Sequence, residues 1–243
     1  MSQRSTLALV LAAGQGTRMK SSMPKVLHEI AGAPMLAHVM AAAQASGLRD
    51  AALVIAPGMS AIEDMAKDVL PGVQLFVQEE QLGTAHAVLA AREVLEGFCG
   101  DVVILYGDTP LIRPQTLAKM LKVLKDDADI AVLGFEAKDP AGYGRLITDK
   151  SGSLKAVREE KDASADERAI DLCNSGVFAF RGEILLGLLD KIGNDNAKGE
   201  YYLTDAVELA CGDGLRTAVV TCAEQEVMGV NSKLQLAAAE AEK

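Results

Sequence analysis

The chain has 243 residues and 49% of them are hydrophobic, which is enough for one large α/β domain or two small ones with a full core. With 24 basic and 34 acidic residues the formal net charge is −10, so the chain has no general attraction for nucleic acid and any phosphate site must be local. It contains no apolar run long enough to span a bilayer, and its first residues lack the apolar core of a signal peptide. We therefore expect a cytoplasmic protein that binds neither nucleic acid nor membranes.

The cysteines and histidines give no sign of a disulfide framework or a zinc site. The three histidines are too scattered to act as a ligand set, and the four cysteines show no Cys-x-x-Cys spacing. We expect the cysteines to be small buried residues in a reducing compartment. They are Cys99, Cys173, Cys211 and Cys222.

Strand-like and helix-like segments alternate through the first half of the chain. Short apolar runs predict strands at residues 7–11, 51–56, 73–78, 102–106 and 130–135. Helices are predicted at residues 34–46, 60–69, 84–95 and 114–125. Ser60 is expected to cap the second of these, with Glu63 in the capping-box position. The alternation predicts a parallel sheet with helices on both faces, joined by right-handed crossovers.

The pattern changes from about residue 140. A glycine-punctuated strand is predicted to open with residues 142–145, and further strands are predicted at residues 154–159, 172–180 and 217–221. Helices are predicted at residues 181–192, 203–211 and 232–243. No segment of helix length lies between residues 142 and 180, so we expect mixed or antiparallel additions beside the main sheet. The last helix is rich in alanine and glutamate and has no evident partner, which favours a linker toward a further domain.

Side chains are small in the loop that follows the first strand. Residues 11–19 read Leu-Ala-Ala-Gly-Gln-Gly-Thr-Arg-Met, so a ligand can approach the backbone N–H groups, which bind anions well after a parallel strand. Arg18 and Lys25 follow with no acidic residue between them, and this combination suits a polyphosphate. The dinucleotide fingerprint needs a third glycine where Met19 stands, and the P-loop pattern is absent. Without the two cations, the glycines alone favour an ordinary tight turn.

Two further unusual loops follow strand ends, where ligands bind in sheets of this type. Asp108 comes directly after an apolar strand and suits Mg²⁺, which prefers oxygen ligands and shares its sites with phosphates. The alternative is a simple turn cap. Asn231 offers a second oxygen, although its residue type and position favour the cap of the final helix.

The loop at residues 78–84 is polar but has no basic residue, so it cannot hold phosphate. Its glutamine side chains and amides can instead read the hydrogen-bonding edge of a base. The alternative is the N-terminus of a helix capped by Thr84, with the glutamates favourable to the helix dipole. Both interpretations can hold together.

These motifs carry a resemblance. Residues 11–19 with Pro24-Lys25 are similar to the signature of sugar-1-phosphate nucleotidyltransferases. More closely, the chain resembles the uridyltransferase half of the bacterial bifunctional N-acetylglucosamine-1-phosphate uridyltransferases/glucosamine-1-phosphate acetyltransferases. Further motifs in matching order extend the resemblance over essentially the whole chain, but the hexapeptide repeats of the acetyltransferase half are absent. The matching motifs are Gln81-Leu82-Gly83-Thr84, Tyr106-Gly107-Asp108, Gly142-Tyr143-Gly144-Arg145, Glu159 with Lys161-Asp162, Asn174-Ser175-Gly176, residues 199–205 and Gly229-Val230-Asn231.

The resemblance implies an α/β, Rossmann-like nucleotidyltransferase fold, with a mostly parallel mixed sheet, helices on both faces and a small antiparallel addition. It also implies residue roles. The uridine would be held by Leu11, Ala12, Ala13, Gly14, Gln78, Gly83 and Thr84. Tyr106, Gly107 and Asp108 would also bind substrate, and Asp108 and Asn231 would bind Mg²⁺. Gly144, Glu159 and Asn174 would bind the sugar, and Arg18 and Lys25 would act on the phosphates.

The implied reaction is Mg²⁺-dependent uridylyl transfer from UTP to N-acetylglucosamine 1-phosphate. It yields UDP-N-acetylglucosamine and pyrophosphate, for peptidoglycan and lipopolysaccharide precursors. Residues 1–231 would form the nucleotidyltransferase domain and residues 232–243 the start of a linker helix, with a homotrimer only if an acetyltransferase domain follows. The rivals are another sugar-1-phosphate nucleotidyltransferase, using glucose 1-phosphate or dTTP, and a UDP-sugar sensor without turnover. The basic pair Arg18 and Lys25 argues against the sensor.

Overall fold

A nine-stranded mixed sheet runs through the computed structural model, which describes residues 4–243. Its main path has the order β11-β7-β10-β6-β1-β4-β5. Four neighbouring strands are parallel: β1 (Thr6–Leu11), β4 (Asp50–Ile55), β5 (Gln74–Val77) and β6 (Asp101–Tyr106). The predicted parallel sheet is therefore confirmed, and the carboxyl ends of these strands share one edge.

The second half of the chain adds the antiparallel part. Its strands are β7 (Ile130–Glu136), β8 (Arg145–Thr148), β9 (Leu154–Arg158), β10 (Leu172–Arg181) and β11 (Thr217–Thr221). The small antiparallel addition is confirmed in β8 and β9, which pair with each other. However, β10 lies inside the main sheet, antiparallel to both β6 and β7, rather than beside it. Its residues 177–180 are all buried, which suits a strand covered on both faces.

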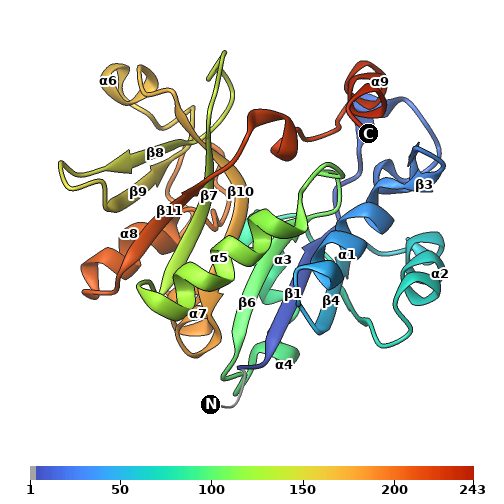
Figure 1. Ribbon diagram of the computed structural model, residues 1–243, viewed down its shortest axis with the longest axis horizontal. Helices are drawn as coiled ribbons and strands as arrows, with labels where there is room; N and C mark the ends of the chain where they lie inside the picture. The colour runs from blue at the N-terminus through green and yellow to red at the C-terminus, as the bar shows by residue number, and fades with distance from the viewer. Residues whose placement is uncertain (1–3) are drawn as a thin grey trace.

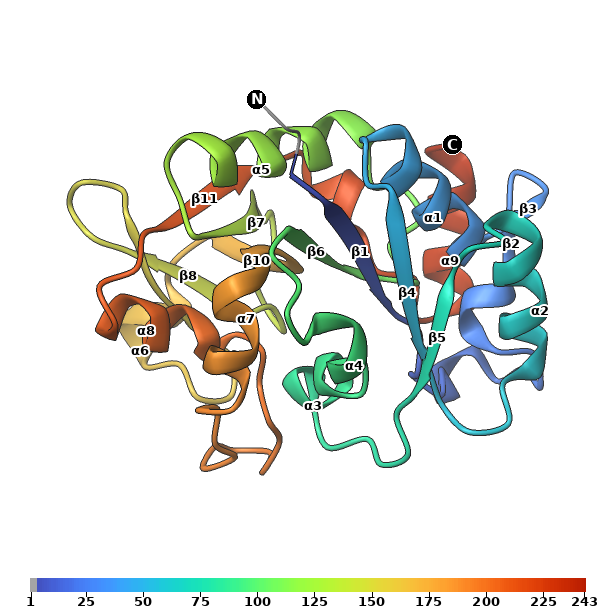
Figure 2. The ribbon, with the colours of Figure 1, turned by 90° about the horizontal axis from the view of Figure 1, so that it is seen from below.

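Helices cover both faces of the sheet, as the alternation predicts (Figure 2). On one face lie α1 (Met35–Ala45), α2 (Ser60–Val69) and α5 (Pro114–Asp126). On the other lie α3 (Thr84–Leu89), α4 (Arg92–Leu95), α7 (Gly182–Leu189) and α8 (Asp205–Gly212). The short α6 (Ala165–Arg168) has a capping box at Ser164. Each face contributes its own apolar cluster, so the sheet separates two layers of core.

Two helix predictions need correction. The segment 84–95 is not one helix, because α3 and α4 are separated at residues 90–91. Ser60 is the first residue of α2 and not its cap, since the non-helical backbone angles fall on Met59. The Glu63 side chain accepts a hydrogen bond from Lys67 at 2.6 Å instead of returning to the start of the helix.

The C-terminal helix α9 (Lys233–Ala241) has a partner, contrary to the expectation from sequence. It packs beside the hairpin of β2 (Glu29–Ile30) and β3 (Ala33–Pro34), as Figure 1 shows. Its Ala239 is fully buried in a cluster with Ile30, Met35 and Val230. Among residues 4–243, no helix combines the length and the apolar character of a membrane span.

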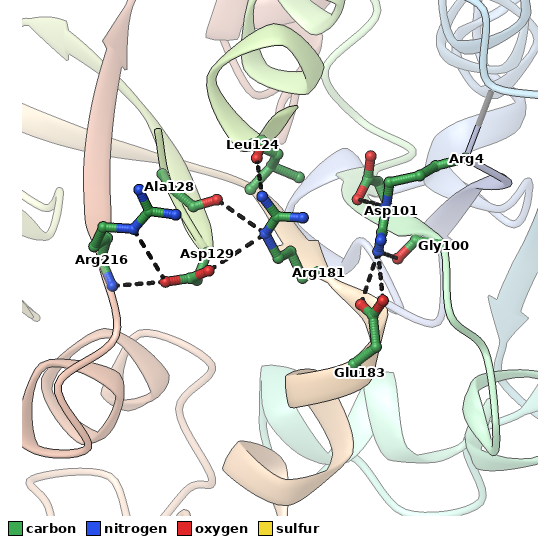
Figure 3. A network of polar contacts seen from close by, with 9 residues as sticks. All are labelled: Arg4, Gly100, Asp101, Leu124, Ala128, Asp129, Arg181, Glu183 and Arg216. Atoms are coloured by element: carbon green, nitrogen blue, oxygen red, sulfur yellow. Dashed lines mark hydrogen bonds and ion pairs between the residues drawn. The ribbon is translucent and has the colours of Figure 1, made fainter. Parts of the chain in front are cut away.

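Charged residues meet in a network at the amino ends of the parallel strands (Figure 3). Arg4 pairs with Asp101 at 3.0 Å and with Glu183 at 2.7 Å. Arg181 donates to the Leu124 carbonyl at 2.7 Å and lies 3.3 Å from Asp129. These contacts join the starts of β6 and β7 to the end of β10.

Candidate active site

A cavity of about 350 Å³ opens at the carboxyl ends of β1 and β6. Its wall combines backbone from the glycine loop, polar side chains from the loop after β5, and the charged residues that follow β6. Ten predicted site residues line it: Leu11, Ala12, Ala13, Gly14, Lys25, Gln78, Gly83, Thr84, Tyr106 and Asp108. Three loops that are far apart in the sequence therefore meet at one edge of the sheet, as the strand order requires.

The start of the glycine loop is held between neighbouring strands. Ala12 donates its backbone N–H to the Val54 carbonyl at 2.8 Å, and Gly107 donates to the Leu11 carbonyl at 3.0 Å. Gly14 is exposed, and a Cβ there would meet no atom within 4 Å. The loop thus presents open backbone to the cavity from a rigid base.

Gly16 explains how Lys25 reaches the cavity. Gly16 has φ +61°, and a Cβ at this position would lie 2.5 Å from the Lys25 Cβ, so a side chain would push Lys25 away. Lys25 itself begins a 3₁₀ turn, Lys25–Leu27, directly after Pro24. The glycine is therefore needed for the close approach of the lysine as well as for the turn.

Lys25 joins the two predicted metal ligands. Its ammonium forms an ion pair with Asp108 and donates a hydrogen bond to the Asn231 Oδ1 at 3.0 Å. The Lys25 and Asp108 side chains are only 11% and 15% exposed, so the pair is well shielded from water. The backbone N–H of Val230 also donates to the Asp108 carbonyl at 2.9 Å, which fixes Asn231 beside Asp108.

The donor set of these residues suits Mg²⁺. One carboxylate oxygen and one amide oxygen both contact the Lys25 ammonium, so they lie near enough to share a cation, and Mg²⁺ commonly takes one or two protein oxygens and completes its shell with phosphates and water. Within residues 4–243, no cluster of three or more His, Cys, Asp or Glu side chains could hold a metal ion.

Asn231 does not cap the final helix. Ser232 is the N-cap of α9, and its hydroxyl accepts a hydrogen bond from the Gln235 N–H at 3.3 Å. The interpretation of Asn231 as a cap, which its residue type favours, is therefore wrong. Its amide is left free to face Lys25.

Arg18 lies apart from the cavity wall. It belongs to a 3₁₀ turn, Thr17–Met19, and its side chain is exposed. It is two residues from Gly16, which contacts Lys25, so both cations belong to the same edge of the sheet. The structure brings Lys25 to Asp108 and leaves Arg18 on the neighbouring surface.

The loop after β5 is built around two glutamines. Gln78 is 4% exposed and turns back into its own loop, where its amide nitrogen lies 3.3 Å from the Gly83 carbonyl and 3.1 Å from the His86 Nδ1. Gln81 lines the cavity together with Ala13 and donates to the Ala13 carbonyl at 2.6 Å. Gln78 thus shapes the loop, and Gln81 joins it to the glycine loop.

The same loop is tied to the segment at residues 199–205. Gly83 has φ +121°, and a Cβ there would lie 2.5 Å from the Tyr201 carbonyl oxygen, so only glycine fits. Thr84 is the first residue of α3 and not its cap, and its hydroxyl accepts a hydrogen bond from the Leu203 N–H at 2.9 Å. The predicted capping role of Thr84 is therefore wrong.

The predicted sugar-binding residues lie outside the wall of this cavity, and Gly144 lies close to Asn174 and to Arg158, the neighbour of Glu159. Asn174 donates its N–H to the Gly144 carbonyl at 2.8 Å, and Glu159 accepts from the Thr204 hydroxyl at 3.2 Å. Burial raises the pKa of Glu159 above its usual range. Glu159 lines a separate cavity of about 220 Å³ together with Tyr202.

Tyr106 lies between the two groups of residues. Its ring packs on Gly176, where a Cβ would lie 2.8 Å from the ring. Burial raises the pKa of Tyr106, and the nearby carboxylates of Glu159 and Asp108 raise it further. The neutral phenol therefore persists at physiological pH, and it connects the Asp108 side of the site with the Glu159 side.

Four residues of the cavity wall were not among the predicted site residues. They are Val26, Gln81, Ala87 and Glu200. Gln81 and Glu200 are polar residues within motifs that the sequence analysis identified, Gln81-Leu82-Gly83-Thr84 and residues 199–205. Their position in these motifs could have predicted them as site residues. Val26 and Ala87 are apolar and carry no such signal.

Comparisons with known proteins agree with the motifs. The profile of the MobA-like NTP transferase domain matches residues 8–170, more than half of the chain. Bifunctional protein GlmU of Nitrobacter hamburgensis is 56% identical over 240 residues, which cover 99% of this chain and 53% of the relative. The proteins of that name from Azorhizobium caulinodans and Ruegeria sp. are 57% and 53% identical, over 99% and 98% of this chain and 54% and 52% of their own lengths.

The chain spans about half the length of these curated relatives. The resemblance to a bifunctional family that the sequence motifs indicated is confirmed by relatives that carry that description. The profile match, the α/β sheet and the loops at its carboxyl edge all agree. The chain belongs to the family of MobA-like NTP transferase domains.

Proposed function

We propose that this chain transfers the uridylyl group of UTP to N-acetylglucosamine 1-phosphate, with Mg²⁺ as cofactor. The observation that carries the proposal is the meeting of Lys25, Asp108 and Asn231 at a cavity whose other wall is open backbone. A nucleoside triphosphate needs such a combination of anion-binding backbone, a fixed cation and oxygen ligands for a metal ion. The family and the named relatives support the same class of reaction.

In this reaction the phosphate oxygen of the sugar phosphate attacks the α-phosphorus of UTP in line. The bond from the α-phosphorus to the oxygen that bridges to the β-phosphate breaks, and pyrophosphate leaves. The attacking phosphate is already ionised near neutral pH, so the protein needs no general base. Catalysis therefore rests on positioning and on stabilising charge.

Asp108 and Asn231 would hold Mg²⁺, which when bound neutralises charge on the reacting phosphates. Lys25 would stabilise charge on the transferring phosphate, because its ammonium already lies beside both ligands. Arg18 would act on the leaving pyrophosphate from the neighbouring turn, in the way that basic side chains act in phosphoryl transfer.

The base and the sugar would lie on opposite sides of Tyr106. The backbone of residues 11–14 and the loop 78–84 would hold the uridine, and the Gln81 bridge to Ala13 closes that side of the cavity. Gly144, Glu159 and Asn174 would bind the N-acetylglucosamine group, with the Glu159 carboxylate accepting from a sugar hydroxyl.

The proposal extends to the place of this chain in the cell. Its product would supply peptidoglycan and lipopolysaccharide precursors in the cytoplasm. Residues 1–231 would form the catalytic domain, and residues 232–243 would lead to an acetyltransferase domain, which would bring homotrimer formation with it. The length of the relatives, about twice that of the matched region, supports this arrangement.

A substrate panel tests the proposal. UTP, dTTP and CTP are each combined with N-acetylglucosamine 1-phosphate, glucosamine 1-phosphate and glucose 1-phosphate, and pyrophosphate release is measured. We expect the highest kcat/KM for UTP with N-acetylglucosamine 1-phosphate. A preference for dTTP or glucose 1-phosphate would identify the related transferase instead, and calorimetric binding of UDP-N-acetylglucosamine without any pyrophosphate release would identify a sensor.

A further inference from the structure

The segment from Met228 to Lys243 returns to the candidate active site and touches it at two points. Val230 donates its backbone N–H to the Asp108 carbonyl at 2.9 Å. Asn231 accepts a hydrogen bond from Lys25 at 3.0 Å. Both contacts come from residues just before α9. A shift of α9 would therefore also move the Asn231 amide.

Gln235 fixes the backbone of this junction. Its side-chain oxygen accepts from the Asn231 N–H at 2.9 Å and from the Ser232 hydroxyl at 3.3 Å, while its own N–H donates to the Ser232 hydroxyl oxygen. The first turn of α9 is thus linked to Asn231 by a side chain of the helix itself. Gln235 is not among the residues that line the cavity.

Glu240 fixes the other end of α9. Its carboxylate accepts a hydrogen bond at 2.8 Å from the backbone N–H of Ala31, in the turn of the β2–β3 hairpin. Ala31 has φ +49°, a left-handed conformation that a non-glycine residue adopts only at some cost. The bond therefore supports a strained turn, next to the fully buried Ala239 contact.

The hairpin under α9 continues directly from the turn that carries Lys25. Residues 25–27 form that turn, and β2 begins at Glu29. The N–H of Met35 donates to the His28 carbonyl at 3.0 Å, which closes the hairpin against the Lys25 turn. Helix α9 therefore joins the segment of Lys25 to the segment of Asn231, two residues that meet at Asp108.

We propose that α9 is a positioning element for the Mg²⁺ site, with Gln235 and Glu240 as its positioning residues. Docking of the helix on the hairpin sets the Asn231 amide oxygen beside the Asp108 carboxylate. The inference rests on the proposed function, because it concerns how well these two oxygens bind a divalent cation. Residues that orient metal ligands from outside the ligand set typically change metal affinity by about 10–100-fold.

The test measures Mn²⁺ binding to the whole chain by electron paramagnetic resonance of the free ion. We expect Gln235→Ala and Glu240→Ala each to weaken Mn²⁺ binding by about 10-fold. Gln235→Glu and Glu240→Gln keep an acceptor oxygen in place and should restore affinity to within about twofold of wild type. Leu234→Ala is the matched control, since Leu234 is 81% exposed on the same helix and should leave binding unchanged.

A second readout separates positioning from stability. In Gln235→Ala and Glu240→Ala, a displaced Asn231 should raise the Mg²⁺ concentration needed for half-maximal pyrophosphate release. The kcat of both variants at saturating Mg²⁺ should stay within about threefold of wild type. Unchanged Mn²⁺ affinity in folded Gln235→Ala and Glu240→Ala would overturn the inference. If Asp108→Ala also leaves Mn²⁺ binding unchanged, the proposed metal site itself fails, so the two failures are distinguishable.

Discussion

The two ends of the central sheet use charge in opposite ways. At the amino end, arginines and carboxylates are paired with each other and with backbone carbonyls (Figure 3). The carboxylate of Asp129, for example, pairs with two arginines, whose Nε atoms lie at 3.3 Å (Arg181) and 3.7 Å (Arg216). Fixed pairs of this kind join strands and leave little charge free for a ligand.

At the carboxyl end, charge faces a cavity. Lys25 meets Asp108 and Asn231 at the wall of the 350 Å³ cavity, and Arg18 is exposed on the adjoining turn. Similar residue types thus pair across neighbouring strands at the amino end, and at the carboxyl end they lie beside a cavity and open backbone. Substitutions at the two ends should therefore separate stability from activity.

The largest effect is expected from Asp108→Ala at the carboxyl end. We expect Mg²⁺-dependent pyrophosphate release to fall by about 10³-fold, because the variant loses the proposed metal ligand and the partner of Lys25. The measurement is kcat over a range of Mg²⁺ concentrations, with the thermal midpoint as a check on folding. Full recovery of wild-type turnover by excess metal would make Asp108 a weak contributor.

Arg18→Ala should reduce kcat by about 10²–10³-fold, equivalent to about 2.7–4 kcal/mol by analogy with a preorganised charge-stabilising donor. The KM for UTP should change little, because the proposed contact forms mainly as charge develops on the leaving group. Steady-state kinetics of pyrophosphate release supply both values. Near-normal turnover would refute the role of Arg18.

The amino end should respond in the opposite sense. Arg181→Met keeps the apolar stem of the side chain but removes its hydrogen bonds to the Leu124 and Ala128 carbonyls and its pairing with Asp129. We expect the free energy of unfolding to fall by about 1–3 kcal/mol, with kcat unchanged. Urea unfolding measures the first quantity, and the more exposed Arg92→Met is the control, with a loss below about 1 kcal/mol. A loss of kcat in folded Arg181→Met would break the comparison.

An effect of similar size, but dependent on pH, concerns Asp205 at the first turn of α8. Burial raises the pKa of Asp205 to about 6, and its value in an unfolded chain is about 3.9. The folded state holds this proton more tightly, so the contribution of Asp205 to stability is fully present below about pH 4 and is lost as pH rises through about 6. In Asp205→Asn the side chain stays uncharged at every pH, so this loss of stability at high pH does not occur.

The variant should therefore be more stable than wild type by about 1–3 kcal/mol at pH 8, and the two should be equally stable near pH 4. Urea unfolding at both pH values measures the difference. A stability difference that does not depend on pH would show that the Asp205 carboxyl does not titrate in this way.

The sequence predicted the parallel half of the fold well because each strand there is a continuous apolar run with a helix between it and the next. It could not place β10 between β6 and β7, since strand order depends on contacts between segments that are roughly 40 to 80 residues apart. The break between α3 and α4 was also missed, because residues 84–95 are alanine-rich throughout and carry no proline or glycine.

The site shows the same division. The glycine loop, the polar loop and Asp108 were found because strand ends converge at one edge of a parallel sheet. The meeting of Lys25 with Asn231 joins residues more than 200 positions apart, and no local pattern could predict it. Helix caps were the least predictable feature. Ser60 and Thr84 are residue types that often cap helices, but each is the first residue of its helix, and the N-cap position falls on the preceding residue, Met59 or Gly83.

The most direct test of uridylyl transfer is ³¹P nuclear magnetic resonance of the chain with UTP, N-acetylglucosamine 1-phosphate and Mg²⁺. We predict that the signals of UTP and the sugar phosphate fall while the paired signals of a diphosphate diester and the signal of pyrophosphate rise, with the two products in equal amounts, and that Asp108→Ala shows no product in the time that the wild-type chain needs. Unchanged UTP and sugar phosphate with the wild-type chain would contradict the account.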